Sequence, residues 1–101
     1  MLKHVLMWKV KSEYNGKKKP ELIDELAARL ESLIAIPEVV SLEVGKNVSD
    51  RGNAFDIFFL SEFKGDDDLQ SYRNNSYHLK VAEYISLVTE SGFVVDYYSS
   101  E

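Results

Sequence analysis

Apolar and polar side chains alternate over residues 2–11, which predicts a first β-strand. One face of this strand carries Leu2, His4, Leu6, Trp8 and Val10. The opposite face carries Val5 and Met7 between lysines. Because apolar groups lie on both faces, we expect both sides of the strand to be covered by other parts of the assembly.

Helical periodicity follows at Pro20, after a polar stretch over residues 12–19 that we predict to be a loop. Pro20 suits the first turn of a helix, where its missing N–H costs nothing. Apolar residues then recur on one helical face: Leu22, Ile23, Leu26, Ala27, Leu30, Leu33 and Ile34. Pro37 holds Ile36 in an extended conformation, so the helix is predicted to end there.

Two further alternating segments, residues 39–48 and 54–63, lie on either side of a turn signal at residues 49–53. We interpret them as an antiparallel hairpin. A helix then begins at Asp66–Asp68, whose charge suits a helix N-terminus. Residues 73–76 favour a break, with Ser76 capping a second helical piece. Gly92 is predicted to stop that piece, before a last strand over residues 93–98.

The order β-α-β-β-α-β predicts an α+β, ferredoxin-like fold with a four-stranded antiparallel sheet, in one domain over residues 1–101. Right-handed crossovers put both helices on one face of the sheet. The other face then carries Val5, Met7, Phe58 and Leu60. Soluble monomers rarely expose such a patch, so we expect a homodimer that packs sheet against sheet.

Composition narrows the classes of function. The net charge of −5 argues against a general nucleic-acid or membrane-surface role, since both need a basic face. The chain has no cysteine, and neither a signal peptide nor a stretch of membrane-spanning length is recognisable, so we expect a cytoplasmic protein. We expect no metal and no cofactor, because His4, His78 and Asp56 lack ligand spacing and no phosphate-binding glycine loop is present.

Two histidines and one tyrosine are the candidate functional residues. His78 can act as a general base near neutral pH, or it can simply pack or cap the second helix. Tyr72 lies six residues earlier, and the predicted break would aim both side chains into one cavity as an acid/base pair; the alternative is a core tyrosine. His4 shares a strand face with Leu6 and Trp8, as the polar anchor of a pocket or as a hydrogen-bonded core histidine.

Five segments also carry a resemblance: residues 2–11, Ile36-Pro37-Glu38-Val39, Phe55–Phe63, Tyr72–His78 and Val94-Val95-Asp96-Tyr97. In this order and spacing they resemble the stress-responsive A/B barrel domain, also called the dimeric α/β barrel domain, over nearly the whole chain. The resemblance implies a dimer closed through its sheets into an α/β barrel. In the fourth segment, Asn75-Ser76 stand where that family usually has His-Pro.

The best-defined activity of that family belongs to plant polyketide cyclases, which close a linear polyketide by intramolecular aldol chemistry without metal or cofactor. Their tyrosine and histidine match Tyr72 and His78, and a further histidine of the plant enzymes aligns with Ile57. Many bacterial members have no assigned reaction.

We therefore expect a small, largely apolar pocket between sheet and helices in each subunit. Its predicted ligand-binding residues are His4, Leu6, Trp8, Ile57, Phe59 and Phe63. Three functions stay open: binding of a small apolar molecule without catalysis, a cofactor-free acid/base reaction of the lyase or cyclase kind, and a cofactor-independent monooxygenase reaction.

Overall fold

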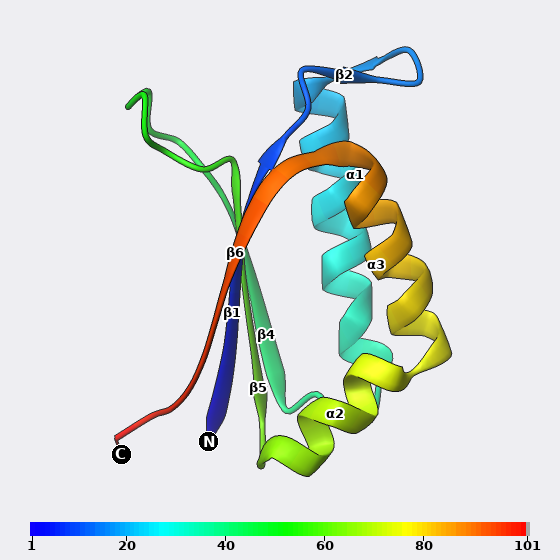
Figure 1. The fold of residues 1–101 in the computed structure, drawn as a ribbon, viewed down its shortest axis with the longest axis vertical. Coiled ribbons are helices and arrows are strands. Elements are labelled where there is room, and N and C mark those ends of the chain that lie inside the picture. The colour runs from blue at the N-terminus through cyan, green and yellow to red at the C-terminus, as the bar shows by residue number, and fades with distance from the viewer. Residues whose placement is uncertain (101) are drawn as a thin grey trace.

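A four-stranded antiparallel sheet in the order β4-β5-β1-β6 forms one layer of the fold (Figure 1). The computed structural model describes residues 1–100, and its sheet strands are β1 (Leu2–Val10), β4 (Ser41–Lys46), β5 (Ile57–Phe63) and β6 (Thr89–Tyr98). Because β5 lies between β1 and β4, and β1 lies between β5 and β6, the two helical crossovers interlock. This arrangement is the predicted ferredoxin-like fold.

The helices form the second layer, on one side of the sheet only (Figure 1). They are α1 (Lys19–Glu31), continued by a 3₁₀ turn η1 (Ser32–Ala35), then α2 (Asp66–Asn74) and α3 (Ser76–Val88). Apolar residues of α1, above all Leu22, Leu26 and Leu30, are almost fully buried against the sheet. Among residues 1–100, each helix is too short or too polar to cross a bilayer.

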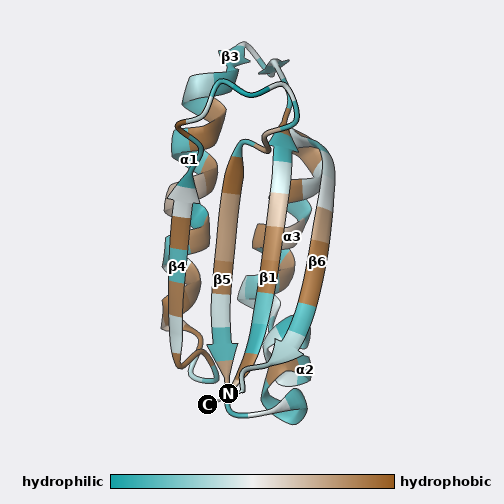
Figure 2. Cartoon of the chain, turned by 90° about the vertical axis from the view of Figure 1, so that its left-hand side faces the viewer, coloured by the Kyte–Doolittle hydropathy of each residue, from teal (hydrophilic) through white to brown (hydrophobic). Residues whose placement is uncertain are grey.

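Alternation along β1 and β5 sorts their side chains as the sequence predicts. On β5, Ile57, Phe59 and Phe63 are buried under the helices, while Phe58 and Leu60 between them are only half-buried. Figure 2 views the sheet from the side without helices, where apolar residues occur along the strands. We call this side the open face. Its most exposed apolar positions lie on β6, where Phe93 is 63% and Val95 56% exposed.

Three local predictions need correction. The polar stretch at residues 12–19 contains a small hairpin, β2 (Glu13–Tyr14) with β3 (Lys17–Lys18). It turns through Asn15 and Gly16, both at positive φ (52° and 83°), as an Asn-Gly hairpin turn requires. The hairpin strands predicted at residues 39–48 and 54–63 are shorter: β4 lacks two residues at each end, and β5 begins only at Ile57, because the ladder pairs residues 41–46 with 57–62.

The last strand also begins earlier, at Thr89 instead of Phe93. α3 ends at Val88, and Gly92 is no helix stop but a residue inside β6, paired with Trp8 of β1. A β-carbon at Gly92 would lie 2.5 Å from Cδ1 of Trp8. The glycine therefore serves close packing of the Trp8 indole on β6, which turn statistics alone cannot reveal.

The break between α2 and α3 occurs where it is predicted, but Asn75 makes the cap instead of Ser76. Asn75 has an extended backbone, and its Oδ1 accepts hydrogen bonds from the backbone N–H of Tyr77 (2.8 Å) and of His78 (3.4 Å). Asparagine is among the best N-cap residues. This cap fixes the direction in which α3, and with it His78, leaves the junction.

Candidate functional site

A cavity of about 310 Å³ lies on the helix side of the sheet, over β1 and β6 and below the α2–α3 junction. We call it the helix-side cavity. Its lining residues come from four elements: His4, Leu6, Trp8, Arg73, His78, Ala82, Ile85, Val94 and Asp96. Most of this wall is apolar, with four polar side chains at one region, which is the usual composition of a small-molecule site.

The two ring nitrogens of His78 differ: Nδ1 has a hydrogen-bond partner, and Nε2 has none among residues 1–100. Its Nδ1 lies 3.1 Å from the backbone carbonyl oxygen of Arg73, the next-to-last residue of α2. A carbonyl oxygen only accepts, so Nδ1 carries the proton and donates it to this bond. Nε2 of the neutral ring therefore holds a lone pair, which is what a general base needs.

The surroundings of His78 favour this neutral form. Burial lowers the pKa of the imidazole below its ordinary value of 6.5, and the neighbouring His4 and Arg73 lower it further. The hydrogen bond to the Arg73 carbonyl works in the opposite direction, but burial is the larger effect. At pH 7 His78 is therefore an uncharged proton acceptor.

His4 and Asp96 form the second polar pair. They face each other across β1 and β6, and Nδ1 of His4 donates to the Asp96 carboxylate. His4 is 7% exposed, whereas the Asp96 side chain is 40% exposed. On the other side of His4 lies its β5 partner Ser61, whose buried hydroxyl has no hydrogen-bond partner among residues 1–100. The carboxylate thus orients the imidazole and fixes which nitrogen carries its proton.

Tyr72 contacts His78 but does not line the cavity. Their ring centroids are 4.4 Å apart at 51°, and Tyr72 is 1% exposed. Its ring also packs on Phe63, at 4.9 Å, and lies edge-on to His4, at 6.4 Å. Burial raises the pKa of the Tyr72 hydroxyl, so this group stays protonated. The predicted pair is therefore brought together, with His78 at the cavity and Tyr72 supporting it from the core.

The predicted ligand-binding residues divide into two groups. His4, Leu6 and Trp8 line the helix-side cavity together with His78. Phe59 and Phe63 are 1% and 0% exposed and belong to the core beneath the helices. Ile57 is also buried and reaches only the hollow on the open face. Phe59 and Phe63 thus lie on the predicted strand face, but they fill the core below the helices and do not reach the cavity.

Sequence reasoning misses two polar residues of the cavity, Asp96 and Arg73. Asp96 alternates with Val95 and so falls on the helix side, but its meeting with His4 depends on the β1–β6 register. That register joins the two ends of the chain and has no local sequence signal. Arg73 stands in the segment predicted to break, where a solvated arginine is the ordinary expectation.

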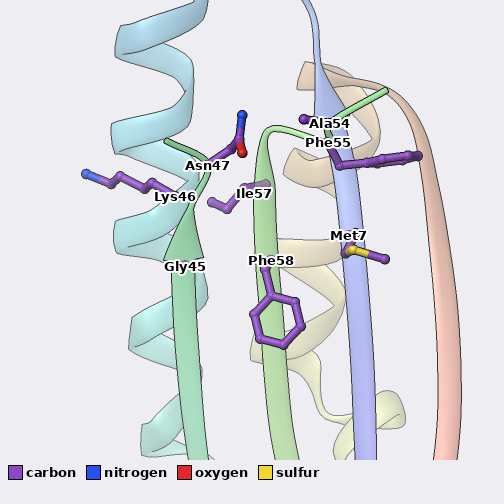
Figure 3. A pocket seen from close by; sticks show the side chains of 8 residues that line it. All are labelled: Met7, Gly45, Lys46, Asn47, Ala54, Phe55, Ile57 and Phe58. Carbon is purple, nitrogen blue, oxygen red and sulfur yellow. The ribbon is translucent and has the colours of Figure 1, made fainter. Parts of the chain in front are cut away.

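A second hollow, of about 340 Å³, lies on the open face near the 47–56 loop. Figure 3 shows the side chains around it, with Met7, Phe55 and Phe58 on the open side of the sheet. Its lining is apolar except for Lys46 and Asn47, and the Lys46 ammonium is ion-paired with Asp24 at 2.8 Å. The helix-side cavity is therefore the better candidate site. Among residues 1–100, no group of three or more potential metal ligands is assembled.

Comparison with known proteins now adds to this geometry. The sequence model of the Stress responsive A/B Barrel Domain matches residues 2–99. The chain belongs to this family. No curated protein matches its sequence.

Solved structures with a similar fold include proteins described as dimeric. A dimeric protein of unknown function with a ferredoxin-like fold from Bacteroides fragilis is 26% identical, with 95% of this chain and 93% of that chain covered and a TM-score of 0.81. A dimeric ferredoxin-like protein of unknown function from Thermobifida fusca is 16% identical (95% and 88% covered, TM-score 0.82). A hydroxynitrile lyase from Passiflora edulis is 22% identical (99% and 94% covered, TM-score 0.84). The last two establish a shared fold.

Proposed function

We propose that this A/B barrel protein is a homodimer that binds a small, largely apolar molecule in the helix-side cavity of each subunit. The observation that carries the proposal is the cavity itself, in which an apolar wall meets Arg73, His78 and the His4–Asp96 pair. Its volume of about 310 Å³ suits a molecule of roughly ten to fifteen non-hydrogen atoms.

The open face supports the dimer. Met7, Phe93, Val95 and Tyr97 are each at least 37% exposed, and they neighbour one another across β1 and β6. Leaving such a patch in water is unfavourable, and a two-fold copy of the same patch covers it on both subunits. The Bacteroides fragilis relative is described as dimeric, which supports a dimer here. Packing through the sheets leaves both helix-side cavities outside the interface.

Filling the cavity tests the binding proposal. Ala82 lines the cavity from α3, so Ala82→Phe places a ring in the space of a ligand. We expect phenylacetamide to change the fluorescence of Trp8, the only tryptophan of the chain, with a dissociation constant of roughly millimolar order. In Ala82→Phe the affinity for phenylacetamide should fall at least about tenfold.

The matched control is Ala28→Phe, the same substitution at an exposed position of α1. It should bind phenylacetamide as the unchanged protein does. A response that survives in Ala82→Phe and disappears in Ala28→Phe would contradict the assignment of the site.

A cofactor-free acid/base reaction in the same cavity is the second candidate function. The observation that favours it is the neutral His78, whose Nε2 is free to accept a proton while Tyr72 packs on its ring. Abstraction of a proton next to a carbonyl group would begin an aldol or lyase reaction.

The pKa of His78 gives a direct measurement. In a proton NMR titration, the His78 imidazole should titrate below pH 6.5, because burial disfavours its charged form. A substrate with a linear β-polyketone chain, heptane-2,4,6-trione, should cyclise with loss of water faster in the presence of the protein. His78→Gln should lower that rate by about 100-fold at an unchanged free energy of unfolding.

Tyr72→Phe removes the hydroxyl and keeps the ring, so it tests the contribution of the hydroxyl to the cyclisation rate without removing the packing of the ring on His78. An unchanged cyclisation rate in His78→Gln, or no acceleration by the unchanged protein, would exclude the enzymatic candidate and leave binding alone.

A further inference from the structure

The helix-side cavity contains a cation that the proposed binding of an apolar molecule does not use. Arg73 belongs to the last turn of α2, is exposed, and is one of the residues that line the cavity. Within residues 1–100 the ion pairs are formed by His4 and by lysines, so no carboxylate lies within 4.0 Å of the Arg73 guanidinium. The acidic residues of α2 occupy its first turn, at the other end of the helix.

Other features hold Arg73 beside the cavity. Its backbone carbonyl accepts the Nδ1–H of His78, and Asn75 caps the helix that follows immediately. By contrast, Arg29 is occupied by a cation–π contact with the Tyr84 ring, at 3.8 Å. Arg73 thus has a fixed backbone beside the cavity and, among residues 1–100, a guanidinium without an ion-pair partner.

The remaining charged group of the cavity lies on another element. Asp96 keeps its negative charge on β6, where its carboxylate accepts the Nδ1–H of His4. His78 is neutral and offers an acceptor at Nε2. On the α2 side of the cavity, Arg73 is therefore the cation that a bound anion can pair with.

We propose that the natural ligand is a small monoanion, a carboxylate on an apolar aromatic or aliphatic body, with its charge at Arg73 and its body against Trp8 and Ile85. This inference rests on the proposed function and names the class of ligand for the same site. A guanidinium binds a carboxylate through paired N–H groups, which gives direction as well as attraction. The body of the ligand then lies in the same cavity as His78.

Two probes of the same size separate charge from shape: phenylacetate and phenylacetamide, titrated against Trp8 fluorescence at pH 7.5. We expect phenylacetate to bind about five- to tenfold more tightly than the amide. In Arg73→Gln the two dissociation constants should agree within about twofold. Lys80→Gln is the matched control, since Lys80 is an exposed cation of α3 outside the cavity lining; it removes the same charge and should keep the preference.

Equal affinities for the two probes in the unchanged protein would overturn the anionic class while leaving the pocket in place. A preference for phenylacetate that persists in Arg73→Gln would also overturn the proposal, because a group other than Arg73 would then bind the carboxylate. If neither probe changes Trp8 fluorescence up to about 10 mM, the proposed binding function itself fails and this inference with it.

Discussion

Val95→Lys is expected to convert the proposed dimer into monomers of 11.6 kDa. Val95 is 56% exposed on the open face, on the edge strand β6, paired with Val5 of the neighbouring strand. A lysine at this position places a charge in an apolar interface, at a cost of roughly 2–3 kcal/mol per copy. Two-fold symmetry doubles the cost, so the dissociation constant rises roughly 10³- to 10⁴-fold.

Sedimentation at micromolar concentration measures this change directly. Ile34→Lys is the control, because Ile34 lies in η1 on the helix layer and is 52% exposed, close to the exposure of Val95. It adds the same charge and should leave the assembly unchanged. If the unchanged protein already sediments as a monomer, the open face is not an interface between copies of this chain.

Gly92→Ala should destabilise the fold and disturb the cavity wall together. The added methyl group would lie 2.5 Å from Cδ1 and 3.0 Å from Nε1 of Trp8, and 3.1 Å from the carbonyl oxygen of Met7. Trp8 is 8% exposed, so its indole can leave this contact only by moving against the core or into the cavity. We expect a loss of about 2–3 kcal/mol in the free energy of unfolding and weaker binding of phenylacetamide.

Gly45→Ala makes the comparison specific, because Gly45 also lies inside a strand of the same sheet. There the new methyl group would lie 3.7 Å from Cβ of Phe58, an ordinary contact. Urea unfolding of both variants at one protein concentration should show a large loss for Gly92→Ala and a change within about 1 kcal/mol for Gly45→Ala. Similar losses in both would mean that Trp8 does not depend on the glycine.

The sequence predicts the fold well because the information is local and repeated. Period-two alternation identifies β1 and β5 and the side chains that they bury, and period-3.6 spacing identifies α1. The break before His78 is also local, since residues 73–76 are poor helix interior. The choice of Asn75 over Ser76 as the cap is not, because both residue types cap helices well and only the geometry of the junction distinguishes them.

The candidate site is less predictable from the sequence, because it depends on the register of strand pairing and on how deeply each side chain is buried under the helices. Strand alternation places Phe59 on the helix side correctly, but it cannot tell a cavity wall from a core position under a helix. Asp96 reaches His4 only because β1 and β6 pair over a separation of 92 residues. Gly92 is ambiguous for the same reason, since a glycine that ends a helix and one that accommodates an indole look alike in sequence.

β6 is shared between two surfaces. Val94 and Asp96 turn toward the helix-side cavity, and the residues beside them, Phe93 and Val95, turn toward the open face. One backbone thus carries both the ligand wall and the proposed contact with a second copy. Occupancy and assembly are then linked thermodynamically: if ligand binding displaces β6 and changes the dimerisation constant by some factor, dimerisation changes the ligand affinity by the same factor.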